Sequence, residues 1–235
     1  MALLNGRATM PCKRLVIAFD GPAGAGKSTV ARLTAKELGY LYLDTGAMYR
    51  ALALKALTQG VDLRDQEQLS ALLGKTAIEL EQGRDHVLRV YLDGREVSDL
   101  LRTPEVNASV SLVAEFPDIR SEMVMRQRAV AKRGGGVMDG RDIGTVVLPD
   151  ADVKFFLTAS LRARAQRRQI DLKALGYEVD LAQLAADIEH RDALDSSRAH
   201  SPLRQADDAV LVDTTEAGVE AVLERILREC RKHVC

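Results

Sequence analysis

Tryptophan is absent from this chain of 235 residues, and aromatic side chains as a whole make up only 4% of it. Proteins that bind single-stranded nucleic acid stack bases on aromatic rings, so the composition disfavours this class of binder. The formal net charge is −1, which gives no electrostatic reason to expect a nucleic-acid polymer as a partner. Any positive charge that matters for function must therefore be local.

Cysteine and long apolar runs are scarce as well. The three cysteines, Cys12, Cys230 and Cys235, show no C-x-x-C spacing, so neither a disulfide framework nor a zinc site is indicated. No apolar run approaches the ~20 residues that a membrane span requires, and residues 1–14 lack the apolar core of a signal peptide. We expect residues 1–14 to be a flexible extension and the protein to be cytoplasmic, with no membrane partner.

Apolar residues, by contrast, make up 46% of the chain, which is enough for a substantial core. Short apolar segments alternate with helical segments, and this order predicts an α/β fold with a parallel sheet covered by helices on both faces. Between residues 76 and 97 the pattern changes to short β segments separated by turn residues, which predicts a small antiparallel insert. We expect residues 15–235 to form a single domain.

The most specific motif is the segment 21–28, Gly-Pro-Ala-Gly-Ala-Gly-Lys-Ser, which has the spacing of a P-loop between a predicted strand and a predicted helix. Glycines let backbone N–H groups turn toward an anion, and the helix N-terminus adds partial positive charge. Lys27 can reach the β- and γ-phosphates, and the Ser28 hydroxyl can ligate Mg²⁺. The alternative is a glycine-rich turn that fits by chance. The motif predicts a nucleoside triphosphate site formed by Gly21, Pro22, Ala23, Gly24, Ala25, Gly26, Lys27, Ser28 and Thr29.

Kinases, motors and switch GTPases all share the P-loop, so other polar clusters must decide among them. Residues 44–50 and 139–142 each follow a predicted strand, at the sheet edge where α/β proteins bind ligands. Arg191, Asp195 and Arg198 are spaced to share one face of a helix, and arginines suit a phosphate held by bidentate contacts. A solvated stripe of ion pairs would show the same spacing. A second cluster on a later helix comprises Arg162, Arg164, Arg167 and Arg168.

Five segments together resemble bacterial cytidylate kinases, a family of nucleoside monophosphate kinases. They occur in the family's order within about residues 15–230, at positions 20–29, 44–50, 116–120, 139–147 and 191–198. The resemblance implies a P-loop NTPase-type parallel sheet, a monophosphate-binding subdomain in the insert at about 62–112, and a helical lid at about 160–180. It also implies a monomer that uses small-molecule substrates.

The same resemblance implies transfer of the γ-phosphoryl group of ATP to CMP or dCMP, with Mg²⁺ as the cofactor bound at Ser28. It implies that the catalytic residues are Lys27, Arg141, Arg198 and the lid residue Arg167. The implied acceptor site consists of Ser111, Arg120 and Asp142 on the cytosine, of Arg50, Arg141 and Arg198 on the monophosphate, of Arg191 and Asp195 on the ribose, and of Thr45 and Tyr49 along the wall.

Two rival functions remain open at this point. One is another small-molecule P-loop kinase, acting on AMP, UMP or shikimate, which would share the loop and an arginine-rich lid. The other is a regulatory nucleotide switch without phosphoryl transfer. A guanine-specific switch would need an N-K-x-D motif, which the sequence lacks, and would give no reason for a second arginine-rich cluster.

Overall fold

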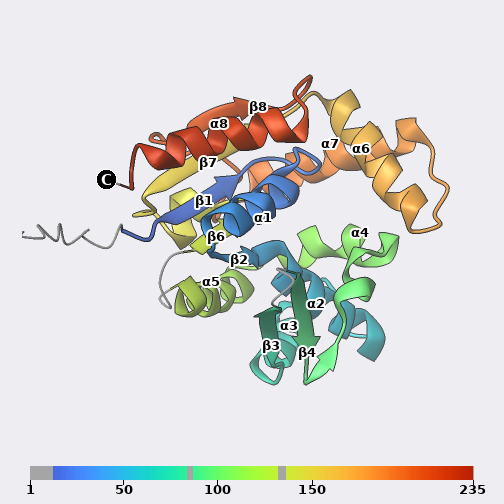
Figure 1. The fold of residues 1–235 in the computed structure, drawn as a ribbon. Helices are drawn as coiled ribbons and strands as arrows, with labels where there is room; N and C mark the ends of the chain where they lie inside the picture. Colours follow the sequence, from blue (N-terminus) through green and yellow to red (C-terminus); the bar gives the residue numbers. More distant parts are fainter. Residues whose placement is uncertain (1–12, 84–86, 132–135, 235) are drawn as a thin grey trace, which may run out of the picture.

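A computed structural model describes residues 13–83, 87–131 and 136–234. Its main sheet is parallel throughout, with strands in the order β2-β6-β1-β7-β8 (Figure 1). The five strands are β1 (Val16–Asp20), β2 (Leu41–Asp44), β6 (Gly136–Asp139), β7 (Val153–Thr158) and β8 (Val210–Asp213). The predicted parallel sheet is confirmed.

Helices cover both faces of this sheet because each presents an apolar stripe. On one face, α1 (Lys27–Leu38) and α8 (Val219–Arg231) pack over β1, β7 and β8. Val222, Ile226 and Cys230 recur every fourth residue of α8 and are buried there. On the other face, α5 (Pro117–Ala131) and a π-helical turn, η2 (Ile143–Val147), cover β1, β2 and β6.

The predicted antiparallel insert is a sheet of three strands, β3 (Ile78–Gln82), β4 (Leu88–Leu92) and β5 (Arg95–Glu96). Asp93 and Gly94 both have positive φ, 51° and 79°, which suits the tight turn between β4 and β5. The sheet packs with neighbouring helices around two apolar clusters. These elements are α2 (Thr45–Gln59), α3 (Gln66–Gly74), the 3₁₀ helix η1 (Ser98–Arg102) and α4 (Pro104–Val113).

The segment of about 160–180, expected to be a lid, contains helix α6 (Leu161–Ala174). It packs against α7 (Leu181–Ser197), and the two helices extend to one side of the main sheet (Figure 1). Ala165 and Leu172 of α6 meet Leu184 and Ile188 of α7. The two helices therefore share a small apolar core of their own, separate from that of the sheet.

The first part of the expected extension, residues 1–12, lies outside the described residues. Arg14 is tied to the domain, because its Nη2 donates to the carbonyl of Gly39 at 2.8 Å. Within the described ranges no helix is long and apolar enough to span a membrane. Cys230 is buried and carries a free thiol, and burial raises its pKa to about 12, so it is unreactive core material.

Candidate active site

The P-loop joins β1 to α1 and is built in a way that only glycine permits. Gly21, Gly24 and Gly26 have φ values of 141°, 76° and 84°. A Cβ on Gly21 would lie 2.0 Å from the carbonyl oxygen of Leu157, so the loop passes directly against β7. No side chain caps α1 at Gly26, which leaves the first N–H groups of the helix available to an anion.

Lys27 is the first residue of α1, and its side chain is almost fully buried at 5% exposure. Its Nζ donates to the carbonyl of Pro22 at 2.6 Å. Burial, together with the nearby charge of Arg141, lowers the pKa of Lys27 well below 10.5. Burial thus disfavours the charged form of Lys27, and an anionic ligand beside Nζ would stabilise that form.

Ser28 faces the carboxylate at the end of β6. Its Oγ donates to Asp139 Oδ2 at 2.8 Å, and the Tyr42 hydroxyl donates to Oδ1 of the same carboxylate at 2.8 Å. Burial and the charge of Asp44 raise the pKa of Asp139 to about 6. A hydroxyl and a carboxylate, both oxygen donors, are the ligand chemistry that Mg²⁺ prefers beside phosphates, so these residues fit that ion.

The acceptor-side arginines are oriented by carboxylates. Arg50 Nη2 lies 2.6 Å from Asp44 Oδ2, and Arg141 Nε donates to Asp195 Oδ2 at 2.9 Å. Burial raises the pKa of Asp44, but Arg50 and then Arg102 outweigh it, so the net pKa is below 3.8. Both carboxylates therefore stay charged at neutral pH and hold the guanidinium groups in place.

Arg198 is not on the helix face predicted for it. Helix α7 ends at Ser197, and Arg198 has extended backbone angles of φ −56° and ψ 134°. The guanidinium still reaches the same carboxylate, with Nη2 3.4 Å from Asp195 Oδ1, and its Nη1 donates to the carbonyl of Ala114 at 3.3 Å. The grouping of Arg198 with Asp195 is right, but the helical reason for it is wrong.

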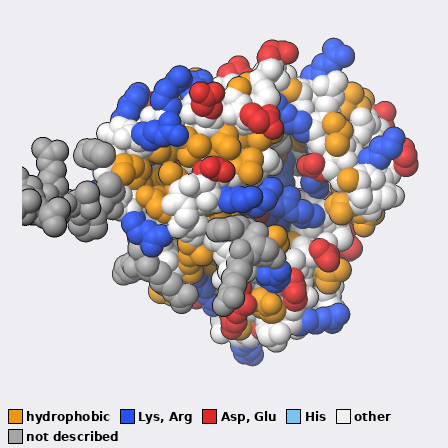
Figure 2. Space-filling view, viewed as in Figure 1, with side chains coloured by type: hydrophobic (Ala, Val, Ile, Leu, Met, Phe, Trp, Pro, Cys, Tyr) orange, Lys and Arg blue, Asp and Glu red, His pale blue; other side chains and the backbone are white. Residues whose placement is uncertain are grey.

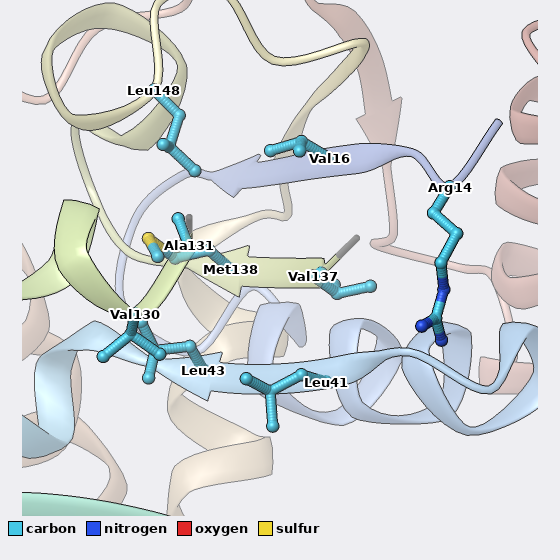
Figure 3. A pocket seen from close by; sticks show the side chains of 10 residues that line it. Arg14, Val16, Leu41, Leu43, Val130, Ala131, Val137, Met138 and Leu148 are labelled. Atoms are coloured by element: carbon cyan, nitrogen blue, oxygen red, sulfur yellow. The ribbon is translucent and has the colours of Figure 1, made fainter. Parts of the chain in front are cut away.

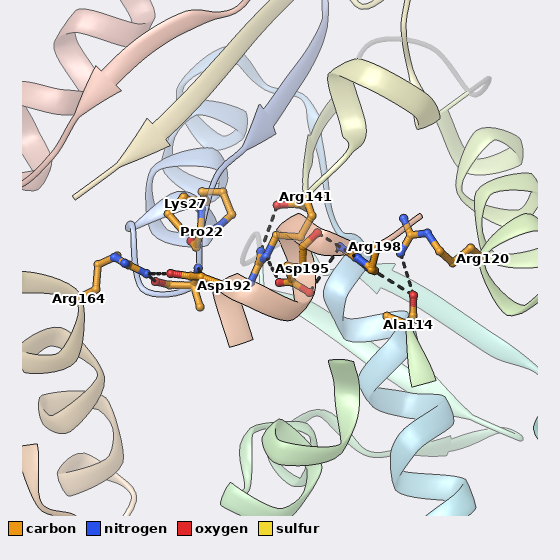
Figure 4. A network of polar contacts seen from close by, with 11 residues as sticks. Pro22, Lys27, Ala114, Arg120, Arg141, Arg164, Asp192, Asp195 and Arg198 are labelled. Atoms are coloured by element: carbon orange, nitrogen blue, oxygen red, sulfur yellow. Dashed lines mark hydrogen bonds and ion pairs between the residues drawn. The ribbon is translucent and has the colours of Figure 1, made fainter. Parts of the chain in front are cut away.

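The residues expected to read the cytosine lie around a buried ion pair. Arg120 of α5 pairs with Asp142, and its Nη1 donates to the carbonyl of Ala114 at 3.3 Å. Its guanidinium also lies over the Tyr49 ring, 5.7 Å from the centroid. Burial raises the pKa of Tyr49 to about 12, so the ring stays neutral. Figure 4 shows that Arg198 and Arg120 meet at Ala114, which links the phosphate and base groups.

Several buried polar atoms of this site have no hydrogen-bond partner among the described residues. Buried donors and acceptors are almost always paired, so an unpaired group needs an explanation. Five of these atoms belong to predicted acceptor residues: Arg50 Nε, Ser111 Oγ, Arg120 Nε, Arg191 Nε and Arg198 Nη2, the last of which has an ion pair with Asp195 but no hydrogen bond. A ligand carrying phosphate, ribose and base would supply their partners.

Positive charge gathers around Arg50 and Arg141. Burial and the neighbouring Arg141 lower the pKa of Arg191 to about 9, which leaves it charged at neutral pH. Burial, with Arg102 and Arg50 nearby, also lowers the pKa of Arg168. Figure 2 shows Lys and Arg side chains gathered where this face of the molecule is hollowed. Guanidinium groups that repel each other in this way are stabilised by a polyanion.

The lid arginines lie at different places. Arg164 Nη1 donates to the carbonyl of Ala23 in the P-loop at 3.0 Å and pairs with Asp192. Arg167 Nη1 donates to Thr214 Oγ1 at 2.9 Å, beside the P-loop rather than over the acceptor side. Arg162 is exposed. The charge of Arg50 is one of the causes that lower the pKa of Arg168.

Sequence reasoning missed several contributors to the site. Asp192 contacts the P-loop, with Oδ1 accepting the N–H of Ala23 at 3.3 Å. Arg102 Nη2 lies 3.7 Å from Asp44 Oδ2, and the Tyr42 hydroxyl donates to Asp139 Oδ1. The alternation of charge in the 191–198 segment included Asp192, but its contact with Ala23 spans 169 positions of sequence. Nothing in the local pattern around Arg102 or Tyr42 could have indicated their partners.

Two cavities lie in the described part of the chain, and one of them borders residues predicted to bind the acceptor. One of about 470 Å³ borders the predicted acceptor residues Ser111 and Arg198 and is lined further by Glu115, Phe116, Pro117, Leu194, Ser197, Ala199 and His200. The other, of about 150 Å³, is lined mainly by apolar side chains and lies between α5 and strands β1, β2 and β6 (Figure 3). Among the described residues that line it, Arg14 is the one with a charged side chain.

Comparison with known proteins identifies the family. The family model described as cytidylate kinase matches residues 17–232. The chain belongs to the cytidylate kinase family. Curated members include a cytidylate kinase of Pelotomaculum thermopropionicum, 55% identical over 211 residues, covering 90% of this chain and 93% of that protein. Another, from Bacillus cereus, is 52% identical over 215 residues, covering 92% and 95%. The chain is therefore a P-loop kinase, as its sequence predicts.

A solved structure supports the fold of this cytidylate kinase family member independently. A protein from Eubacterium ventriosum is similar with a TM-score of 0.50 at 14% identity, covering 94% of this chain and 99% of that chain. At this identity the likeness concerns the fold alone.

Proposed function

We propose that this chain transfers the γ-phosphoryl group of ATP to the phosphate of CMP or dCMP, giving ADP and CDP or dCDP. The observation that carries the proposal is that the P-loop and a cluster of arginines lie at one edge of the sheet. The P-loop follows β1, and Arg141 follows the neighbouring β6 in the same parallel pair. Figure 4 shows Arg141 and Lys27 near one another, with Asp195, Arg198 and Arg120 continuing away from the P-loop.

On the donor side, the N–H groups of the P-loop would bind the β- and γ-phosphates, with Lys27 beside them. The set comprises Gly21, Pro22, Ala23, Gly24, Ala25, Gly26, Lys27, Ser28 and Thr29. Ser28 would hold Mg²⁺, with Asp139 behind it, and the ion would neutralise phosphate charge during transfer. The Ser28–Asp139 hydrogen bond of 2.8 Å supports this assignment, because it orients the hydroxyl.

On the acceptor side, the monophosphate would bind Arg50, Arg141 and Arg198. Arg191 and Asp195 would contact the ribose. A hydroxyl, a guanidinium and a carboxylate can together satisfy the oxygen, ring nitrogen and amine of cytosine. Those groups are Ser111, Arg120 and Asp142, with Thr45 and Tyr49 along the wall.

The reaction needs no dedicated general base, because the attacking oxygen of the acceptor phosphate is already anionic. The barrier comes from bringing two polyanions together, so positioning and electrostatic stabilisation carry the catalysis. Lys27 and Arg141 lie on the two sides of the transferring group, and Arg198 holds the acceptor. We infer that the lid arginines Arg164 and Arg167 act on the ATP side, where closure would exclude water.

Formation of ADP with a panel of acceptors tests this function. CMP and dCMP should stimulate ADP release strongly, and UMP, AMP and shikimate should do so weakly or not at all. A preference for AMP or shikimate would replace the proposal with the rival kinase. Slow ATP hydrolysis that no acceptor stimulates would replace it with the nucleotide switch.

We also propose that the enzyme acts as a monomer in the cytoplasm. Every residue assigned to the two substrates comes from one chain, so the site needs no second subunit. The cytoplasm supplies the ATP that the proposed reaction consumes. Light scattering on the purified protein tests the oligomeric state, and a dimer as the smallest species would contradict it.

A further inference from the structure

Asp20 is a buried carboxylate with no role assigned to it in the proposed reaction. It is the last residue of β1 and directly precedes Gly21 of the P-loop. Its side chain is held by two backbone donors from a distant segment. Oδ1 accepts the N–H of Ile143 at 2.8 Å, and Oδ2 accepts the N–H of Gly144 at 2.7 Å.

These two bonds fix one side of the segment that carries Arg141 and Asp142. The other side is fixed by the preceding residue of β1, because the carbonyl of Phe19 accepts the N–H of Gly140 at 2.9 Å. Two consecutive residues of β1 therefore hold the backbone immediately before and immediately after Arg141 and Asp142. The next residue along the chain begins the P-loop.

The contact is also tightly packed. A Cβ added to Gly144 would lie 3.0 Å from Lys154 Cδ and 3.3 Å from Asp20 Oδ2. Asp20 itself is only 4% exposed. Burying a carboxylate costs free energy that an apolar residue would not cost, and two backbone N–H groups would otherwise be left unpaired. The burial of the Asp20 carboxylate thus lowers the stability of the fold, while its two hydrogen bonds fix the position of the segment 140–144.

We propose that Asp20 is a positioning residue for phosphoryl transfer. It ties the segment bearing Arg141 and Asp142 to the strand that leads into the P-loop, and so sets the separation of acceptor and donor. The inference rests on the proposed function for the roles of Arg141 and Asp142, whereas the anchor itself rests on the two hydrogen bonds.

The substitution Asp20→Asn tests it with little change of volume. An amide has one acceptor oxygen, so its NH₂ group would face one of the two backbone N–H donors, and the segment must shift. Displacements of about 1 Å near reacting groups cost large factors in rate. We expect kcat with CMP to fall at least about tenfold and the CMP-to-UMP preference in kcat/KM to fall at least about threefold, with ADP affinity changed less than about twofold.

Asp152→Asn is the matched control. Asp152 also accepts a backbone N–H of β1, that of Val16, with Oδ2 at 2.8 Å, but at the opposite end of the strand. This variant should lose stability while keeping kcat and base preference within about twofold of the parent. If Asp20→Asn merely loses stability in the same way, with kcat and base preference unchanged, the positioning role is overturned.

Hydrogen exchange gives a readout that needs no substrate. In Asp20→Asn the amides of Ile143 and Gly144 should lose protection, and that of Gly140 should keep it. Unchanged protection at both overturns the anchor even if the chain phosphorylates none of the acceptors, a result that would count separately against the proposed function. Should Asp20→Asn fail to fold, Gly144→Ala crowds the same contact, and it should lower kcat and base preference in the same direction by a smaller factor.

Discussion

Arg141 and Asp195 join the segment after β6 to helix α7, with Arg141 Nε donating to Asp195 Oδ2 at 2.9 Å. Arg198 Nη2 lies 3.4 Å from the other oxygen of the same carboxylate. Burial raises the pKa of Asp195, but Arg141 and Arg191 outweigh it and lower the pKa below 3.8. One charged carboxylate thus orients two of the arginines proposed to bind the acceptor phosphate.

Arg141→Ala should lower kcat with CMP by at least about a hundredfold, or about 3 kcal/mol, because a donor aimed at the transferring group is lost. ADP affinity should change little, since the P-loop is intact. Steady-state kinetics and calorimetry with ADP measure the two quantities. Arg228→Ala, an exposed arginine on α8, serves as the control. A near-normal kcat in Arg141→Ala would remove this residue from catalysis.

Asp142→Ala should erode the preference for CMP over UMP, because no carboxylate then accepts the cytosine amine. It should also destabilise the fold by about 3–5 kcal/mol, since it leaves Arg120 buried without its partner. The ratio of kcat/KM for the two acceptors, measured at a temperature where the variant is folded, checks the first effect. Denaturant unfolding checks the second. An unchanged ratio would exclude Asp142 from base recognition.

Arg164→Ala should raise the KM for ATP about tenfold and leave the KM for CMP nearly unchanged, because Arg164 contacts the carbonyl of Ala23 in the P-loop. Arg162→Ala is the matched control, since Arg162 lies on the same helix but is exposed. Initial rates with each substrate varied in turn measure both constants. Equal effects on the two substrates would show that the lid contact does not act on the ATP side.

The titration of Asp20 should make the free energy of unfolding depend on pH. Burial raises its pKa from 3.8 to about 6, and the N–H groups of Gly144 and Ile143 only partly oppose this rise. Because the pKa is higher in the folded state, protonated Asp20 adds to the free energy of unfolding. This stabilisation is fully present below pH 4 and is lost as pH rises through 6. Relative to Asp20→Asn, the parent should lose about 2 kcal/mol between pH 4.5 and 7.5.

Urea unfolding of the parent and of Asp20→Asn at several pH values gives this difference directly. Other titrating groups are common to both proteins and cancel in the comparison. Parallel stability curves across this range would contradict the raised pKa.

Local sequence predicted the strand, loop and helix of the P-loop segment well, and the grouping of the arginines only in part. The P-loop is a contiguous motif, so spacing alone gives Lys27 and Ser28 together with the flanking strand and helix. Arg198 shows the limit of periodicity, because α7 ends one residue before it. The sequence pattern grouped Arg198 with Asp195 correctly, but it placed both residues on one helix face, which is wrong for Arg198.

Long-range pairings could not be predicted from pattern. Asp20 meets Gly144 across 124 positions, and Arg164 meets Ala23 across 141. Such contacts arise from the strand order β6-β1-β7, which places distant segments side by side at one sheet edge. Periodicity reports which face a residue occupies, but it carries no information on which distant segment will face it.

A crystal structure with CMP and ADP bound together tests the central claim most directly. The account predicts the ADP β-phosphate in the P-loop beside Lys27, and the CMP phosphate facing it on Arg50, Arg141 and Arg198, with the base against Asp142. CMP bound on another part of the molecule, remote from Lys27, would contradict it.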